Sequence, residues 1–231
     1  MTYFRRGSIL LATTAAAFAV GAPGPGSAQQ QPRPATTGTA ATTALATPAA
    51  NPPMTDSVRH GALDLELLPD SRTGVQWGRA TGIVEAPPDV VMRIVTDYAR
   101  YREFLPHFDA SRVLSRRGNN AIVYLQVRAV RETTTLWAQL RIFQRRPRGL
   151  TQIIEGRMMQ GNVARMDARW EVTPLVGGAR TLVAFQFLID PDLPFPDSIV
   201  TNENRRVTRL SLEALRRRVN EPRFRVARRA P

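Results

Sequence analysis

The chain has 231 residues, of which 43% are apolar, so it is long enough for one domain with a substantial core and an additional segment. It contains no cysteine, which excludes disulfides and thiolate chemistry. The only histidines, His60 and His107, lie far apart in the sequence, which argues against a histidine-based metal site. The formal net charge is +13, and all 32 basic residues are arginine.

Residues 1–28 have the features of a secretory signal peptide. Arg5 and Arg6 supply a positive start, residues 9–20 form an apolar run, and Gly26-Ser27-Ala28 supplies small residues for cleavage. The run is short for a membrane span, although an uncleaved anchor is the alternative. We therefore expect a periplasmic or secreted protein, exported by the general secretory or the twin-arginine route.

Residues 29–56 are rich in Gln, Pro, Ala and Thr and contain no aromatic residue. Such a segment buries too little apolar surface to offset the entropy lost on ordering. We interpret it as a disordered linker. The folded domain is predicted to span residues 57–221, and residues 222–231 are predicted to form a basic, frayed tail.

The domain is predicted to open with a strand and two short helices. Residues 58–71 are either a lead-in strand or a turn, and residues 75–85 form the first strand. Pro87 and Pro88 then fit the start of a helix. One apolar face of that helix is formed by Val90, Val91, Ile94, Val95 and Tyr98. The second helix begins near Tyr101 and stops at Pro106.

Alternating apolar and polar residues predict further strands in the middle of the chain. The alternation is clearest around Trp170, where apolar and charged residues exchange at every position. Hairpin turns between short strands predict antiparallel pairing. The expected strands are residues 109–115, 121–128, 132–143, 150–158, 164–172 and 180–189.

A long helix is predicted for residues 195–220, ending before Pro222. Ser211 and Ala214 place small side chains on its inner stripe. The fold class is therefore α+β. It comprises a curved antiparallel sheet of about seven strands gripping a long C-terminal helix, with a short helix pair after the first strand.

Residues 86–108 carry a family resemblance. Ala-Pro-x-x-Val from Ala86, Thr96-Asp97-Tyr98 and Tyr-x-x-Phe-Leu-Pro-x-Phe from Tyr101 resemble the START-like, helix-grip (SRPBCC) superfamily. The nearest branch is the coenzyme Q-binding and polyketide cyclase/dehydrase group. The resemblance covers roughly residues 75–219. It implies a cavity between the sheet and the closing helix.

The resemblance favours a cavity for a hydrophobic ligand over a filled core. Aromatic, Met and small side chains of the helix pair, the strands and the last helix are the expected lining. The predicted ligand-binding residues are Tyr101, Phe104, Leu105, Trp137, Met158, Met166, Trp170, Phe185, Phe187, Leu210, Ser211 and Ala214.

No catalytic signature stands out in the sequence, and no cofactor or metal is expected. Glu132 and Glu155 are polar anchors or acid–base groups if they point inward, and otherwise are exposed, as is Arg128. Asp190 and Asp192 flank a proline at the turn before the last helix, where acidic residues commonly cap.

Arginine is concentrated at the C-terminal end. From Arg205 onward there are ten arginines against Glu213 and Glu221, a net charge of +8. A basic helix can dock on anionic lipid head groups, although a solvated face is the simpler interpretation. Nucleic acid is not an expected partner of an exported protein.

Three functions remain open at this point. The first is an exported carrier for a lipid, isoprenoid or quinone-like compound. The second, which the resemblance implies, is a polyketide cyclase or dehydratase, for which no catalytic pair is assigned. The third is a non-catalytic protein-interaction module. The binding protein is favoured over the enzyme.

Overall fold

The computed structural model describes residues 51–129, 134–191 and 193–225. The expected signal peptide and most of the linker, Glu132, Asp192 and the end of the tail lie outside these ranges. Within them the chain forms an antiparallel sheet in the order β1-β2-β8-β7-β6-β5-β4-β3. The strands are β1 (Asp64–Leu68), β2 (Trp77–Val84), β3 (Phe108–Arg117), β4 (Asn120–Ala129), β5 (Thr134–Arg148), β6 (Thr151–Gly161), β7 (Arg165–Pro174) and β8 (Thr181–Asp190).

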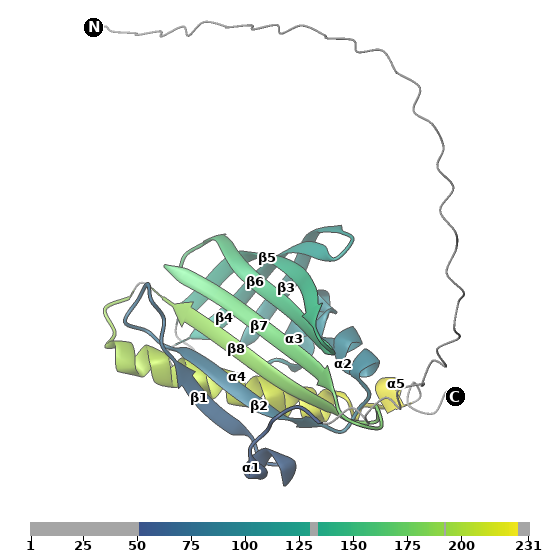
Figure 1. Cartoon of the computed structure of the whole chain (residues 1–231). Helices are drawn as coiled ribbons and strands as arrows, with labels where there is room; N and C mark the ends of the chain where they lie inside the picture. The colour runs from purple at the N-terminus through teal and green to yellow at the C-terminus, as the bar shows by residue number, and fades with distance from the viewer. Residues whose placement is uncertain (1–50, 130–133, 192, 226–231) are drawn as a thin grey trace, which may run out of the picture. The chain divides into compact units, whose positions relative to one another are not determined.

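The sheet is curved, and the long helix α4 (Asp197–Arg218) lies along one face of it (Figure 1). That face is apolar, because alternate residues of each strand point to it. On β7, for example, Met166 and Trp170 are buried while Arg165 and Arg169 point to the opposite face and stay partly exposed. The α+β helix-grip expectation is therefore confirmed.

The short helices after β2 close part of the apolar face. Helix α2 (Pro88–Val95) starts at the expected prolines and buries Val90, Val91, Ile94 and Val95 of the predicted stripe, whereas Tyr98, the fifth member, is buried outside the helix. A 3-10 turn (Tyr98–Arg100) and α3 (Tyr101–Phe104) follow, and the Tyr98 and Tyr101 rings meet edge to face with centroids 5.8 Å apart. This arrangement brings the helix pair against the core that the strands form.

A buried side chain on α4 replaces backbone hydrogen bonds that would otherwise continue the pairing of β2 with β8. The β2–β8 pairing ends at Gly78 and Phe187. Beyond it, the fully buried Asn204 accepts a hydrogen bond from Ile189 N (3.1 Å) and donates to Ile189 O (3.3 Å) and Gln76 O (3.1 Å). The Asn204 amide thus satisfies backbone groups of both strands and ties α4 to them.

Gly78 allows this approach. A Cβ atom at that position would lie well inside van der Waals contact of the Asn204 carbonyl oxygen and Arg205 nitrogen. Backbone has little room to move away from such a clash. Only glycine therefore lets α4 pack so closely on β2.

Two arginines near the end of α4 fix its other half. Arg216 donates to the backbone oxygens of Ile83 (2.9 Å) and Gly61 (2.9 Å). Arg218, only 7% exposed, pairs with Glu103 of α3 and with Glu221 (3.1 Å). Helix α4 is therefore anchored to the N-terminal segment and to the helix pair as well as to the sheet.

Several details differ from the sequence-based expectation. The sheet has eight strands, because residues 64–68 pair with β2 as an edge strand. Strand β5 runs through the expected turn to Arg148. Part of the expected frayed tail is a short helix, α5 (Pro222–Arg225), since the buried Phe224 packs there under Arg218 with the guanidinium 5.9 Å from the ring centroid.

Asn204→Ala should destabilise the domain by about 3 kcal/mol, because each buried backbone group left unsatisfied costs about 1–3 kcal/mol. Urea unfolding measures the loss. Asn202→Ala is the matched control, since Asn202 lies on the same helix but is exposed. Equal, small effects of the two substitutions would contradict the role assigned to Asn204.

Trp170→Ala should cost about 3–5 kcal/mol, the usual range for a large buried aromatic side chain. Trp170 is 3% exposed, and its ring stacks on Phe185 with centroids 4.0 Å apart. Thermal and urea unfolding of the variant test the value. A loss below about 1 kcal/mol would mean that the ring packs against little in solution.

Candidate ligand-binding site

An apolar cavity of about 30 Å³ lies between the helix pair and the apolar face of the sheet. Tyr98, Tyr101 and Leu105 line it on the helix side, and Trp170 and Phe187 are among the strand residues on the other. None of the described lining residues is a carboxylate, a histidine or an arginine. The cavity is about the size of one water molecule and its walls are apolar.

The two phenols of the cavity are neutral and held in place. Burial raises the pKa of Tyr101 well above its usual value, and its hydroxyl donates to Val95 O at 2.6 Å. Burial also raises the pKa of Tyr98, against the opposing effect of the nearby Arg116 guanidinium. Neither phenol is arranged to accept a proton at neutral pH.

A second cavity of about 30 Å³ lies nearer the surface, between α4 and the corner that joins α3 to β3. Val207 and Glu203 of α4 line one side, and Pro106 and His107 of the corner line another. His107 adopts a positive φ of 64°, a conformation that residues other than glycine seldom take. Three charged or polar side chains, those of His107, Arg128 and Glu203, stand among otherwise apolar residues in the wall of the outer cavity, whereas the inner cavity has none apart from its two phenols.

Phe108 and Phe187 line both cavities. The two spaces thus lie on either side of these rings, one toward the surface and one toward the core. The side chains of Phe108 and Phe187 are therefore the wall that the two cavities share.

The structure brings five of the predicted site residues together. Tyr101, Leu105, Trp170, Phe185 and Phe187 all line the inner cavity. Around them it adds residues that the sequence did not single out, because core leucines and isoleucines have no distinctive signal; these are Tyr98, Phe108, Leu125, Leu140, Ile142, Ile154, Gly156 and Ala168.

The remaining predicted residues lie elsewhere. Met166 is fully buried in the main core, and Phe104 and Met158 pack at its edge. Ser211 and Ala214 are buried, and Leu210 is partly exposed. None of these lines the inner cavity, because α4 packs closely on β2 and β8 and leaves space under the helix pair instead.

Trp137 requires a correction. It was expected to oppose α4, but its neighbours Leu136 and Ala138 are the buried residues of β5. Alternation therefore turns Trp137 to the other face, where its ring stacks on Tyr124 with centroids 5.9 Å apart. The alternation of β5 already excluded the inward orientation.

The structure also places two of the polar residues that the sequence analysis considered for the site. Glu155 lies on the face of the sheet away from α4 and accepts from Arg145 (3.0 Å) and Arg169 (3.1 Å), so it is neither an inward anchor nor a freely exposed acid. Arg128 pairs with Asp109 at 2.7 Å beside the outer cavity. No cluster of acidic, histidine or cysteine residues within the described ranges is arranged to hold a metal ion.

The arginines expected to dock on membranes are partly committed to the fold. Arg216 and Arg218 make the contacts with Ile83 O and Glu103 described above. Arg217 is exposed. None of the helices in the described part of the chain combines the length and apolar character that a membrane span needs.

Solved structures with the same fold include proteins described as lipid transfer proteins. A STAR-related lipid transfer protein fragment from Xanthomonas axonopodis gives a TM-score of 0.61 at 13% identity, covering 74% of this chain and 98% of that one. Human StAR-related lipid transfer protein 5 gives 0.59 at 12% identity, covering 70% and 84%. A START superfamily protein from Mycobacterium smegmatis gives 0.53 at 19%, covering 62% and 96%. At these identities the likeness establishes the fold alone.

No curated protein matches the sequence. The family model for polyketide cyclase/dehydrase and lipid transport proteins matches residues 84–216, which is more than half of the chain. The match includes the helix pair, the cavity-lining strands and nearly all of α4, and it confirms the resemblance of residues 86–108. The chain therefore belongs to the polyketide cyclase/dehydrase and lipid transport family.

Proposed function

We propose that this protein binds and carries a hydrophobic small molecule, such as a lipid, an isoprenoid or a quinone-like compound. The observation that carries the proposal is the pair of cavities on either side of Phe108 and Phe187. The outer cavity has His107, Arg128 and Glu203 among apolar residues, and the inner cavity is apolar apart from its two phenols, so polarity falls from the α4 surface inward. A ligand with one polar end and an apolar body fits that gradient.

The described conformation is closed. Small-molecule sites usually enclose about 300–1,000 Å³, whereas each cavity measures about 30 Å³. Binding therefore requires the aromatic side chains and the α3–β3 corner to move outward. Helix α4 is the less mobile wall, since Asn204, Arg216 and Arg218 tie it to three other parts of the domain.

The inner cavity supports carriage more than catalysis. Cyclisation and dehydration of a polyketide need groups that donate and accept protons. Among the described residues that line this cavity, only Tyr98 and Tyr101 titrate, and burial keeps both neutral. The enzyme remains the second candidate, with the outer cavity and its His107 and Glu203 as the place where acid–base groups meet.

Contact with an anionic membrane would complement ligand exchange. Arg216 and Arg218 hold the fold together, and Arg206 and Arg209 pair with Glu203 and Glu213. The arginines of α4 that remain for this role are Arg205 and Arg217. Both are exposed, and neither pairs with a carboxylate among the described residues. A solvated helix surface accounts for them equally well.

Export is part of the proposal and rests on residues 1–28. N-terminal sequencing of the protein from its native host should give a first residue near Gln29. A full-length product retained in the cytosol would contradict export and would return intracellular partners to consideration.

Mass spectrometry of protein purified without detergent should detect a bound apolar compound. Val207→Trp should then weaken binding of the neutral probe N-phenyl-1-naphthylamine by about tenfold or more, because the new ring fills the outer cavity. The fold should tolerate the change, since Val207 is partly exposed. Fluorescence titration measures the affinity.

Ile199→Trp is the matched control for this experiment. Ile199 lies on the same helix, is 54% exposed and lines neither cavity. Absence of probe binding to the wild-type protein would contradict the carrier proposal. Equal affinities of the two variants would contradict entry beside Val207.

A further inference from the structure

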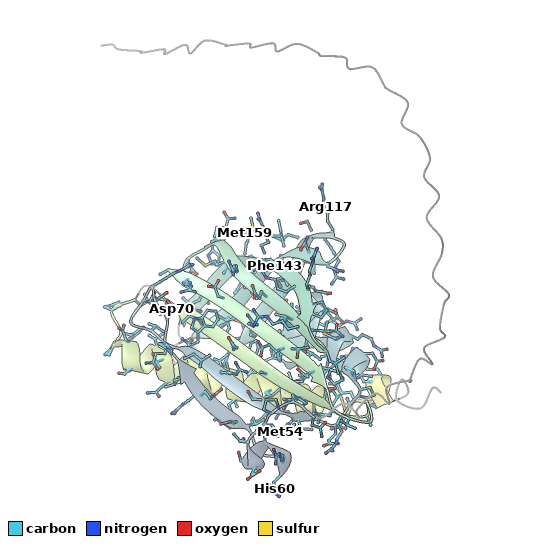
Figure 2. The ribbon with its side chains drawn as sticks, in the orientation of Figure 1. Met54, His60, Asp70, Arg117, Phe143 and Met159 are labelled. Carbon is cyan, nitrogen blue, oxygen red and sulfur yellow. The ribbon has the colours of Figure 1, made fainter. Side chains whose placement is uncertain are left out.

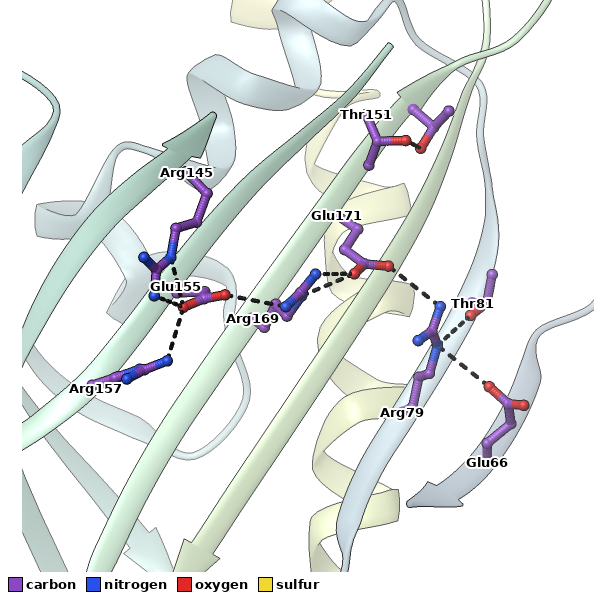
Figure 3. A network of polar contacts seen from close by, with 10 residues as sticks. Glu66, Arg79, Thr81, Arg145, Thr151, Glu155, Arg157, Arg169 and Glu171 are labelled. Carbon is purple, nitrogen blue, oxygen red and sulfur yellow. Dashed lines mark hydrogen bonds and ion pairs between the residues drawn. The ribbon is translucent and has the colours of Figure 1, made fainter. Parts of the chain in front are cut away.

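The face of the sheet opposite α4 carries a larger cleft that the proposed carrier function does not use. The cleft encloses about 440 Å³ and lies over β6 and β7, with Trp77 of β2 at one side. Figure 3 shows charged side chains in front of these strands and α4 behind them. The cleft and the apolar cavities are therefore on opposite faces of the sheet.

Positive charge predominates among the residues that line the cleft. Four guanidiniums, those of Arg72, Arg157, Arg165 and Arg169, face two carboxylates, those of Glu155 and Asp167. Asp70 and Glu171, which lie beside the lining, also pair with Arg165 and Arg169, so the positive charge left over lies on Arg72 and Arg157. A concave surface with excess positive charge attracts anions.

A line of ion pairs crosses the strands and ends at the cleft with an excess of arginine. From β1 it runs through Glu66, Arg79, Glu171, Arg169 and Glu155, with the partners at 2.7–3.3 Å. Glu155 then also receives Arg145 at 3.0 Å and Arg157 at 3.5 Å (Figure 3). Three carboxylates thus serve four guanidiniums, and the last charge is incompletely neutralised.

Arg157 is the least neutralised member of the line. Its side chain is 62% exposed and shares Glu155 with two other arginines. Its cross-strand neighbours are Arg141 on β5, another exposed arginine, and Asp167 on β7, which pairs with Arg165 at 2.7 Å. Like charges directly opposite each other in a sheet are destabilising, and an anion between them would relieve the repulsion.

The other side of the cleft is rigid. Asp70, in the loop before β2 (Figure 2), is 8% exposed and accepts from Arg165 at 2.7 Å, from Trp77 Nε1 at 3.1 Å and from Arg72 N at 3.0 Å. Burial acts to raise the pKa of Asp70, but the bonds from Arg165, Arg72 N and Trp77 outweigh it and lower the pKa to about 2. The loop that carries Arg72 is therefore held against β7.

Arg72 completes the set of available donors. Its backbone is fixed by Asp70, while its guanidinium pairs with no carboxylate among the described residues. Arg165 and Arg169 are each held by two carboxylates and keep a fixed orientation. The cleft thus combines two arginines with bonding capacity to spare and two that form a preorganised wall.

We propose that this cleft binds a small polyanion, a molecule with two or more phosphate or carboxylate groups, between Arg72 and Arg157. Guanidinium groups recognise such oxyanions through paired N–H donors. The volume of about 440 Å³ accommodates a ligand larger than a single phosphate. The same chemistry is presented by a free polyanion and by a phosphorylated lipid head group.

Isothermal titration calorimetry with pyrophosphate tests the site. The wild-type protein should bind pyrophosphate more tightly than orthophosphate, and the affinity should fall with added salt. Arg157→Gln and Arg72→Gln should each weaken pyrophosphate binding by about tenfold, the usual effect of removing one charged donor. Both residues are exposed, so both variants should fold.

Arg117→Gln is the matched control, because Arg117 is exposed at the β3–β4 turn (Figure 2) and does not line the cleft. Two calorimetric results would count against the site: no binding of pyrophosphate, or the same loss of pyrophosphate affinity in Arg117→Gln as in Arg157→Gln. Either result overturns the proposal unless lipid vesicles bind in a second experiment. In that experiment, phosphatidylcholine vesicles with phosphatidic acid should bind the wild type and not Arg157→Gln if the source is a lipid head group. Failure of both experiments overturns the site.

The carrier proposal is tested separately. Arg157→Gln should leave the affinity for N-phenyl-1-naphthylamine unchanged, since Arg157 lines neither apolar cavity. Loss of pyrophosphate binding with retained probe binding would place the anion in a second site. A parallel loss of both would show that the variant disturbs the whole sheet, and would count against a separate polyanion site.

Discussion

The Asn204 side chain determines how the rest of the domain can be arranged. It bonds Ile189 and Gln76 where the pairing of β2 and β8 has ended, so the helix completes the sheet rather than merely covering it. Gly78 permits the close approach that these bonds need. Buried backbone N–H and C=O groups must have hydrogen-bond partners. The bonds to Asn204 therefore fix the position of α4 along the sheet.

The location of the cavities follows from that constraint. Ser211 and Ala214 are buried where α4 packs on β2 and β8, and neither lines the inner cavity. The remaining space lies where the sheet curves away from α4 and the helix pair covers it. The α3–β3 corner forms another part of the wall, and the positive φ of His107 marks it as a place where backbone strain is held. In the proposed carrier, the firm anchoring of α4 would confine opening to this corner.

Elements with a strong period could be predicted from the sequence, and contacts between distant residues could not. The apolar stripe of α2 and the alternation of β7 read directly as a helix and a strand, and both are as expected. Asn204 carries no such signal, since an asparagine in a polar helix resembles any solvated residue. Its role depends on Gln76, which is 128 positions away. Trp137 shows the opposite error, in which residue type was weighed above the alternation that governs direction.

Side chains alternate between the two faces of the sheet along each strand, so that one face is apolar and the other is charged. On β7, Trp170 contributes to the inner cavity, while Arg169 and Arg165 line the charged cleft on the face opposite α4. Successive residues of β7 thus face separate spaces on the two sides of the sheet. Because β6 and β7 are each paired on both sides, a ligand on one face would change the other only by shifting strand register or curvature. Ion pairs that join β1 to β6 across the outer face resist such a shift. The charged face therefore stiffens the sheet, and the opening that the proposed carrier needs would fall to the α3–β3 corner, because Arg218 and Glu103 tie the helix pair to α4.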